Sequence, residues 1–228
     1  MNDILGTQPA PDEWIVWFTA GCALGLVLFR RLWLPARNAI TIAHEGGHGI
    51  VALATGRRLE AIRLHSDTSG LTVSRGRPTG LGIVLTLAAG YPAAPLLGLG
   101  GAALLGTHRT TLLLWAATAL LLALLVMVRN AYGILTVLVT GAAFLLVSLF
   151  TGPDVQGTFA YGAVWFLLLG GVRPAFELQA KRRRGGAPDS DADQLARLTH
   201  VPAGVWLIFF HTVSVCCLIG GGRWLLRF

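Results

Sequence analysis

Charged residues are scarce in this chain, at 13% of 228 residues, whereas about a quarter of a soluble domain is charged. Hydrophobic residues reach 54%, and the mean hydropathy is +0.65. So few charges cannot cover the surface of a water-soluble protein of this size. The composition therefore excludes an ordinary soluble domain and predicts a polytopic membrane protein that lies in a lipid bilayer.

Cysteine is also scarce, and Cys22, Cys216 and Cys217 lie in apolar segments without C-x-x-C spacing. This pattern excludes a disulfide framework and a thiolate metal site. Acidic residues number only 11 against 18 Lys and Arg, so the net charge is +7. The arginines stand at the ends of apolar runs without interleaved aromatic residues. We therefore interpret them as membrane-orienting charges and expect no binding of nucleic acid.

Long apolar runs are abundant, and about seven of them approach the roughly 20 residues that cross the hydrocarbon core of a bilayer. We expect one membrane-embedded domain, 1–228, of all-α class with about 6–7 transmembrane helices. The predicted parts are a first transmembrane helix at 14–34, a short helix at 39–55, a β-hairpin at 57–78, transmembrane helices within 81–175, a polar linker with a short helix at 177–200, and a last transmembrane helix at 202–226.

Two polar segments interrupt the apolar runs. In the first, β-favouring runs flank the turn-like cluster Asp67-Thr68-Ser69-Gly70, which predicts a β-hairpin beside the short helix. In the second, Ser190 can cap a short helix, with Asp193 three residues on as its capping partner.

The short run at 39–55 contains His44-Glu45-Gly46-Gly47-His48, an H-E-x-x-H sequence. Residues i and i+4 of a helix share a face, so His44 and His48 can bind one zinc ion, with Glu45 beside the metal's water. This is the arrangement of a metallopeptidase, in which Glu45 is the general base. The alternative is a polar patch in which the three side chains hydrogen-bond only to one another, which is costly at bilayer depth.

On these residues the chain resembles the M50-type membrane metallopeptidases of the site-2 protease clan, and most closely the smaller bacterial M50B-like group. Other matching pieces follow in order between about residues 40 and 210: Ser69-Gly70-Leu71, Ala89-Gly90-Tyr91, Arg129-Asn130 with Gly133, and Ser190-Asp191-Ala192 followed by Leu195, Leu198-Thr199, Pro202 and Trp206. The resemblance implies a Zn²⁺ enzyme of the bacterial inner membrane that cleaves membrane proteins within or next to their transmembrane segments.

The chain departs from the site-2 proteases in one respect, because the D-G motif that supplies their third zinc ligand is absent. A zinc ion bound by two histidines needs another protein ligand. Asp191 is our candidate, because the Ser-Asp-Ala match places it and a carboxylate in the first turn of a helix can swing under the membrane domain. Asp193 is the next candidate, followed by Asp154 and Glu177. The other explanation of Asp191 is that acids in a first turn stabilise the helix dipole without binding a metal.

The joint at Arg129-Asn130 leaves almost no loop between two apolar runs, which requires a tight antiparallel pair or a broken turn. If the joint faces the metal, Asn130 or Arg129 can donate to the oxyanion of the reaction or contact the substrate. A plain turn with a snorkelling arginine is the alternative.

The orientation of the chain in the membrane follows from its Lys and Arg residues. If every run crosses and the N-terminus is cytoplasmic, 12 of the 18 Lys and Arg residues lie inside. If the short second run does not cross fully, every later loop lies on the opposite side of the membrane.

A second class of function remains open. A membrane scaffold or chaperone-like protein can keep the metal site without hydrolysing any substrate, and the missing D-G motif favours it.

Overall fold

The computed structural model describes residues 6–185 and 187–227, and in these residues eight helices accompany one small hairpin. The elements are α1 (Glu13–Leu28), α2 (Arg30–Ala54), β1 (Arg58–Leu64), β2 (Gly70–Arg75), α3 (Leu81–Gly106), α4 (Thr110–Met127), α5 (Ala131–Phe150), α6 (Pro153–Arg183), α7 (Asp191–Thr199) and α8 (Ala203–Leu225). Five helices, α3 to α6 and α8, are long and apolar enough to span a membrane, and α1 with α2 forms a bent sixth candidate. The expected all-α membrane fold with a hairpin after the H-E-x-x-H helix is confirmed.

The first transmembrane helix, predicted at 14–34, is instead broken at Phe29, where α1 and α2 meet at 101°. A break inside an apolar run frees backbone carbonyls that lipid cannot satisfy. The guanidinium of Arg173 on α6 donates to the freed carbonyl of Val27 and satisfies it. The first two apolar runs thus form one bent pair, which is why the described residues give six spans at most.

Helices α3 and α6 form the middle of the bundle, where α3 contacts α2, α6 and α8. Leu168 of α6 is fully buried there. A side chain at Gly98 or Gly221 would lie within 3 Å of Leu168. Such close approach of helices is how membrane proteins gain packing energy, because lipid offers little hydrophobic driving force between helices.

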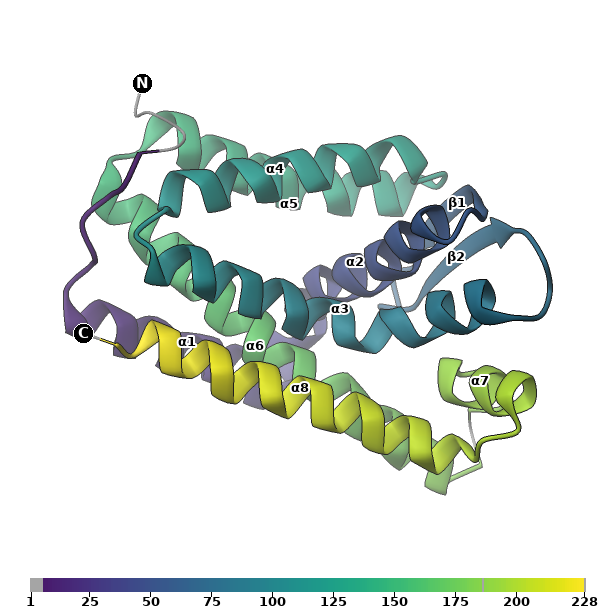
Figure 1. The fold of residues 1–228 in the computed structure, drawn as a ribbon. Helices are drawn as coiled ribbons and strands as arrows, with labels where there is room; N and C mark the ends of the chain where they lie inside the picture. The colour runs from purple at the N-terminus through teal and green to yellow at the C-terminus, as the bar shows by residue number, and fades with distance from the viewer. Residues whose placement is uncertain (1–5, 186, 228) are drawn as a thin grey trace.

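Both described ends of the chain lie at one end of the bundle, which we call the terminal end (Figure 1). The side-chain amide of Gln8 donates there to Thr111 and to Gln156, at 2.6 and 2.9 Å. Trp224 near the end of α8 lies against Gly106 at the end of α3. The α3–α4 turn, the start of α6 and the end of α8 therefore lie together.

The opposite end, which we call the hairpin end, contains β1, β2 and α7 (Figure 1). The two strands pair antiparallel, with Leu64 opposite Gly70. Val128, at the end of α4, forms a parallel bridge with Ile62 of β1. The α4–α5 joint thus lies along the outer edge of β1.

Lys and Arg are divided unequally between the two ends. Three of the 18 belong to the terminal end: Arg109, Arg223 and Arg227. Because the chain bends at Phe29, Arg30, Arg31 and Arg37 lie toward the hairpin end with the other basic residues. From the positive-inside rule we expect the hairpin end to face the cytoplasm and the N-terminus to lie outside, which is the reverse of the orientation expected when every run crosses.

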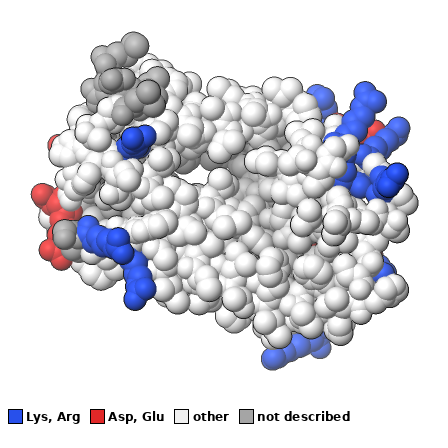
Figure 2. Space-filling view, viewed as in Figure 1, with Lys and Arg blue, Asp and Glu red and all other residues white. Residues whose placement is uncertain are grey.

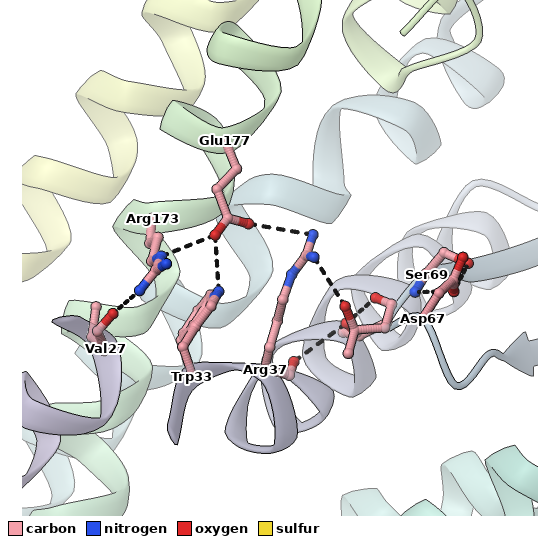
Figure 3. A network of polar contacts seen from close by, with 9 residues as sticks. Val27, Trp33, Arg37, Asp67, Ser69, Arg173 and Glu177 are labelled. Atoms are coloured by element: carbon pink, nitrogen blue, oxygen red, sulfur yellow. Dashed lines mark hydrogen bonds and ion pairs between the residues drawn. The ribbon is translucent and has the colours of Figure 1, made fainter. Parts of the chain in front are cut away.

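A network of polar contacts fixes α2 relative to α6 and the hairpin turn (Figure 3). The carboxylate of Glu177 accepts hydrogen bonds from Arg173 and Trp33, each at 2.9 Å. It also pairs with Arg37 at 3.5 Å, and Arg37 in turn donates to the hydroxyl of Thr68 at 2.9 Å. The two arginines and the carboxylate compensate one another where isolated charges would be costly.

Thr68 in the hairpin turn has a φ of 66°, a conformation that a β-branched residue rarely adopts. Its hydroxyl accepts from Arg37, and its carbonyl accepts from the hydroxyl of Thr41 at 2.9 Å. Two side chains of α2 thus stabilise a strained turn, and they fix the position of the hairpin along that helix.

The orientation can be tested with single cysteines in a variant that lacks the three native ones. We expect a membrane-impermeant thiol reagent to label Arg109→Cys from outside intact cells, and Arg183→Cys only after the cells are permeabilised, because the two positions lie at opposite ends of the bundle. Labelling of Arg183→Cys from outside would contradict the proposed orientation.

The network can be tested by removing the carboxylate of Glu177. Glu177→Ala leaves Arg37 and Arg173 without a counter-charge; loss of one partner costs about 3–5 kcal/mol when the pair is fully buried. Because the Glu177 side chain is 32% exposed, we expect a smaller loss of about 2 kcal/mol in the free energy of unfolding in mixed micelles. Asp189→Ala is the control, since it removes the exposed pair with Arg197 and should change stability by about 0.5 kcal/mol or less. Equal losses in both variants would show that the network does not stabilise the fold.

Candidate metal centre

Helix α2 presents His44, Glu45 and His48 and begins earlier than the predicted 39–55. The helix ends where Gly56 adopts a φ of +74°, and the backbone N–H of Arg57 donates to the carbonyl of Ala52 at 2.8 Å. This is a Schellman cap, in which glycine takes the left-handed position at low cost. The cap turns the chain directly into β1, so the hairpin starts beside the helix that contains the motif.

Helix α7 presents Asp191 from outside the membrane-spanning helices. Ser190 caps the helix as predicted, accepting from the backbone N–H of Asp193 at 3.4 Å. Ala192 and Leu195 are fully buried against residues of α3, α6 and α8. Because this apolar face of α7 points into the bundle, the carboxylate of Asp191 in its first turn is directed toward α2.

The side chains of His44, His48 and Asp191 converge on one point. The two Nε2 atoms lie 3.1 Å apart, and Oδ2 of Asp191 lies 3.2 Å from that of His44 and 3.4 Å from that of His48. Ligand atoms about 2.0–2.1 Å from a tetrahedral zinc ion lie roughly 3.3 Å from each other. Imidazole nitrogen and carboxylate oxygen are both zinc ligands, so these three residues fit a bound metal in geometry and in chemistry.

The protonation of the site suits a metal as well. His48 Nδ1 lies 2.6 Å from the carbonyl of Thr86, which can only accept, so Nδ1 bears the proton and Nε2 presents its lone pair. Burial acts to raise the pKa of Asp191, but the imidazoles of His48 and His44 outweigh it and hold this pKa below its usual range. The carboxylate of Asp191 thus faces the two Nε2 atoms.

Aromatic and small residues of α3 pack against the imidazoles. The ring of His44 meets Tyr91 edge-on with centroids 4.9 Å apart. A Cβ at Gly90 would lie 2.5 Å from His48 Nε2 and 2.7 Å from His44 Cε1. A Cβ at Gly47 would lie 2.5 Å from that of Ala93. Glycine is therefore required at both positions, at Gly47 for the contact between α2 and α3 and at Gly90 for the imidazoles.

Glu45 is buried, with 4% of its surface exposed, and it contacts the hairpin. Its Oε2 accepts a hydrogen bond from the hydroxyl of Thr72 at 2.6 Å. Gly70 packs so closely against the carboxylate that any side chain there would overlap it. The hairpin thus fixes the orientation of Glu45, which is not among the three converging donors.

The other candidate third ligands lie in different contacts. Asp193 pairs with Arg182 and accepts from Ser190, so it anchors α7 to the end of α6. Glu177 belongs to the network with Arg37, and Asp154 lies in the first turn of α6 at the terminal end. Of the four acids considered from the sequence, the structure brings only Asp191 to the histidines within the described residues.

The structure places Asn130 and Arg129, predicted as contacts for an oxyanion or substrate, beside β1. The side-chain amide of Asn130 donates to the carbonyl of Leu64 at 2.6 Å and accepts from its N–H at 3.1 Å. The backbone N–H of Arg129 donates to the carbonyl of Ile62 at 3.0 Å. With these groups engaged by β1, the joint anchors the hairpin, which is a structural role the sequence did not indicate.

Two threonines position side chains of the site, and nothing in the sequence indicated this role. Thr72 holds Glu45, and Thr86 holds His48 through its backbone carbonyl. An isolated threonine is common in membrane helices and hairpins, and only the spatial partner distinguishes these two.

A bundle of membrane-spanning helices that brings a carboxylate to an H-E-x-x-H helix is the architecture of a membrane metallopeptidase. The sequence model of the family described as Peptidase M50B-like matches residues 17–221, and the chain belongs to this family. No curated protein and no solved structure matches the chain.

The close packing at Gly90 predicts the effect of adding one methyl group there. Gly90→Ala should lower the affinity for zinc by about 10–100-fold, the range seen when groups supporting metal ligands are disturbed, because its Cβ would overlap the imidazoles. Gly100→Ala on the same helix is the control, since nothing lies within 4 Å of its Cβ position. Zinc titration against a chromogenic chelator measures both affinities. An unchanged affinity in Gly90→Ala would show that the metal does not bind at His44 and His48.

Proposed function

We propose that this protein is a zinc-dependent endopeptidase of the bacterial inner membrane that hydrolyses peptide bonds in or near transmembrane segments of membrane-protein substrates. The observation that carries the proposal is the triangle of His44 Nε2, His48 Nε2 and Asp191 Oδ2, with sides of 3.1, 3.2 and 3.4 Å. Membership of the M50B-like family supports it.

His44, His48 and Asp191 are the residues that would hold the zinc ion, with one coordination position left open. A zinc ion held there would act as a Lewis acid that activates water and polarises a carbonyl group. A closed structural zinc site has four protein ligands. The three converging donors of the described residues therefore favour a catalytic use.

Glu45 is the proposed general base and acid. It takes a proton from the attacking water and passes it to the amine that leaves when the peptide C–N bond breaks. The hydrogen bond from Thr72 keeps one carboxylate oxygen fixed, and this leaves the other oxygen for the proton. A buried base with a fixed orientation loses little entropy in reaching the reactive geometry.

The hairpin offers a way to hold the substrate backbone. The outer edge of β1 is occupied by residues 128–130, while the sheet has only two strands in the described part of the chain. The outer edge of β2 is therefore open to strand addition by an unwound substrate segment. Because Thr72 of β2 touches Glu45, a strand paired there would run beside the proposed base.

The alternative of a non-catalytic scaffold relied on the missing D-G motif. Asp191 approaches the two histidines from α7 instead of from a transmembrane helix. A third donor is therefore present without that motif, and we favour the peptidase.

The experiment combines metal content with cleavage. Purified wild-type protein should contain about one zinc per chain by inductively coupled plasma mass spectrometry, and His44→Ala and Asp191→Ala should lose it. Asp189→Ala is the matched control for Asp191→Ala and should keep its zinc, because the side chain of Asp189 is exposed. Glu45→Gln should keep its zinc but cleave a library of labelled transmembrane peptides at least about 100-fold more slowly than wild type.

Two results would contradict the proposal. A wild-type protein without zinc would remove the metal site. A zinc-loaded protein whose peptide cleavage is unchanged in Glu45→Gln would assign the metal a structural role.

A further inference from the structure

The open end of the hairpin brings like charges together. Arg58 and Arg75 are directly opposite in the antiparallel register, so their side chains lie on the same side of the sheet. Like charges in such a pair are destabilising. Glu60 compensates Arg75 at 2.7 Å, whereas Arg58 makes no ion pair within residues 6–185 and 187–227.

Arg57 holds the rest of this basic cluster in place. It is buried, and it donates to the carbonyl of Arg77 at 2.7 Å and to the hydroxyl of Ser74 at 3.1 Å. These bonds fix the backbone at Arg77, an exposed residue after β2, beside Arg57, the residue that precedes Arg58 at the start of β1. Figure 2 shows Lys and Arg atoms gathered over the hairpin end, with little acidic surface among them.

A groove of about 680 Å³ opens beside this cluster. It lies between the end of α2, the start of β1 and the last turns of α4, and its lining residues are Leu53, Gly56, Arg57, Arg58, Leu59, Ala123, Val126 and Met127. Leu53 and Val126 are 57% and 63% exposed, which in a membrane helix means contact with lipid. The groove is thus apolar along its wall and basic at its mouth.

We propose that this groove and the arginines at its mouth bind an anionic phospholipid of the cytoplasmic leaflet, with an acyl chain along Val126 and the phosphate beside Arg58 and Arg77. The apolar wall is a continuation of the lipid-facing surface of α4, which a free phosphate ion would leave unused. Basic pockets between membrane helices on the cytoplasmic side are suited to anionic headgroups, and the distribution of Lys and Arg places the hairpin end on that side.

A bound phosphate would have a structural effect on the hairpin. The phosphate would offset the repulsion between Arg58 and Arg75, and the bound lipid would hold the open end of the hairpin against α2 and α4. Because the other part of β2 holds Glu45 through Thr72, the lipid stabilises the strand that orients the proposed base. Lipid binding at this site requires neither zinc nor peptide cleavage, so its test is independent of the test of the proposed function.

Native mass spectrometry of the full chain in detergent, titrated with dioleoylphosphatidylglycerol or dioleoylphosphatidylcholine, tests the proposal. Wild-type protein should bind the anionic lipid at least about tenfold more tightly than the zwitterionic one, and Arg58→Gln/Arg77→Gln should weaken its binding by about 30-fold. The matched control, Arg183→Gln/Arg184→Gln, removes two exposed charges from the same end of the bundle away from the groove and should bind as wild type does.

Ala123→Phe separates a lipid from a free anion, because it fills the groove and keeps every charge. It should weaken binding of phosphatidylglycerol, and Glu45→Gln should leave that binding unchanged. Equal affinity for the two lipids would overturn the proposal, as would equal effects of the two arginine double variants. Unweakened binding in Ala123→Phe, with full competition by inorganic phosphate, would reassign the site to a free anion.

Discussion

The contact between Asp191 and the two imidazoles of α2 is the interaction on which the rest of the site depends. His44 Nε2 and His48 Nε2 point toward each other at 3.1 Å, an arrangement that needs a shared cation or proton to be favourable. The carboxylate supplies the negative charge and the third of the converging donor atoms. It comes from α7, whose buried Ala192 and Leu195 keep the short helix against the bundle. A helix of nine residues outside the membrane thus completes a site within the membrane domain.

The two edges of the hairpin differ, because the edge of β1 is anchored and the edge of β2 is not. Arg37 and Thr41 hold its turn, and Asn130 holds the end of β1, while the outer edge of β2 has no partner strand in the described residues. This asymmetry explains why the α4–α5 joint is so short: residues 128–130 pass directly from a helix onto the edge of β1. The anchored edge keeps Thr72 on Glu45, and the other edge is the one that we propose pairs with a substrate backbone.

The break at Phe29 determines at which end of the bundle the early basic residues lie. A straight helix from 14 to 34 would carry Arg30 and Arg31 away from the hairpin, and the basic residues would then be spread over both sides. The bend keeps the basic residues at the hairpin end. Arg173 lowers the energetic cost of the bend by donating a hydrogen bond to the carbonyl of Val27. The same concentration of positive charge at the hairpin end leads to the proposed binding of an anionic lipid beside the site.

The sequence by itself determined the class of fold, the hairpin at 57–78, the capped helix after Ser190 and the two histidines with their glutamate, because each of these follows from hydropathy, turn residues or helical spacing within a few residues of chain. It ranked Asp191 ahead of Asp193, Asp154 and Glu177 mainly through the Ser-Asp-Ala match, and it could not show that this carboxylate reaches the histidines. Nor could it show that Asn130 binds the hairpin, that Thr72 holds Glu45, or that the first span is bent. These features depend on contacts between segments up to about 150 residues apart. Only the packing of α7 and the helices into one bundle decides which polar group finds which partner, because local sequence sets what a side chain can bond to but not what lies beside it.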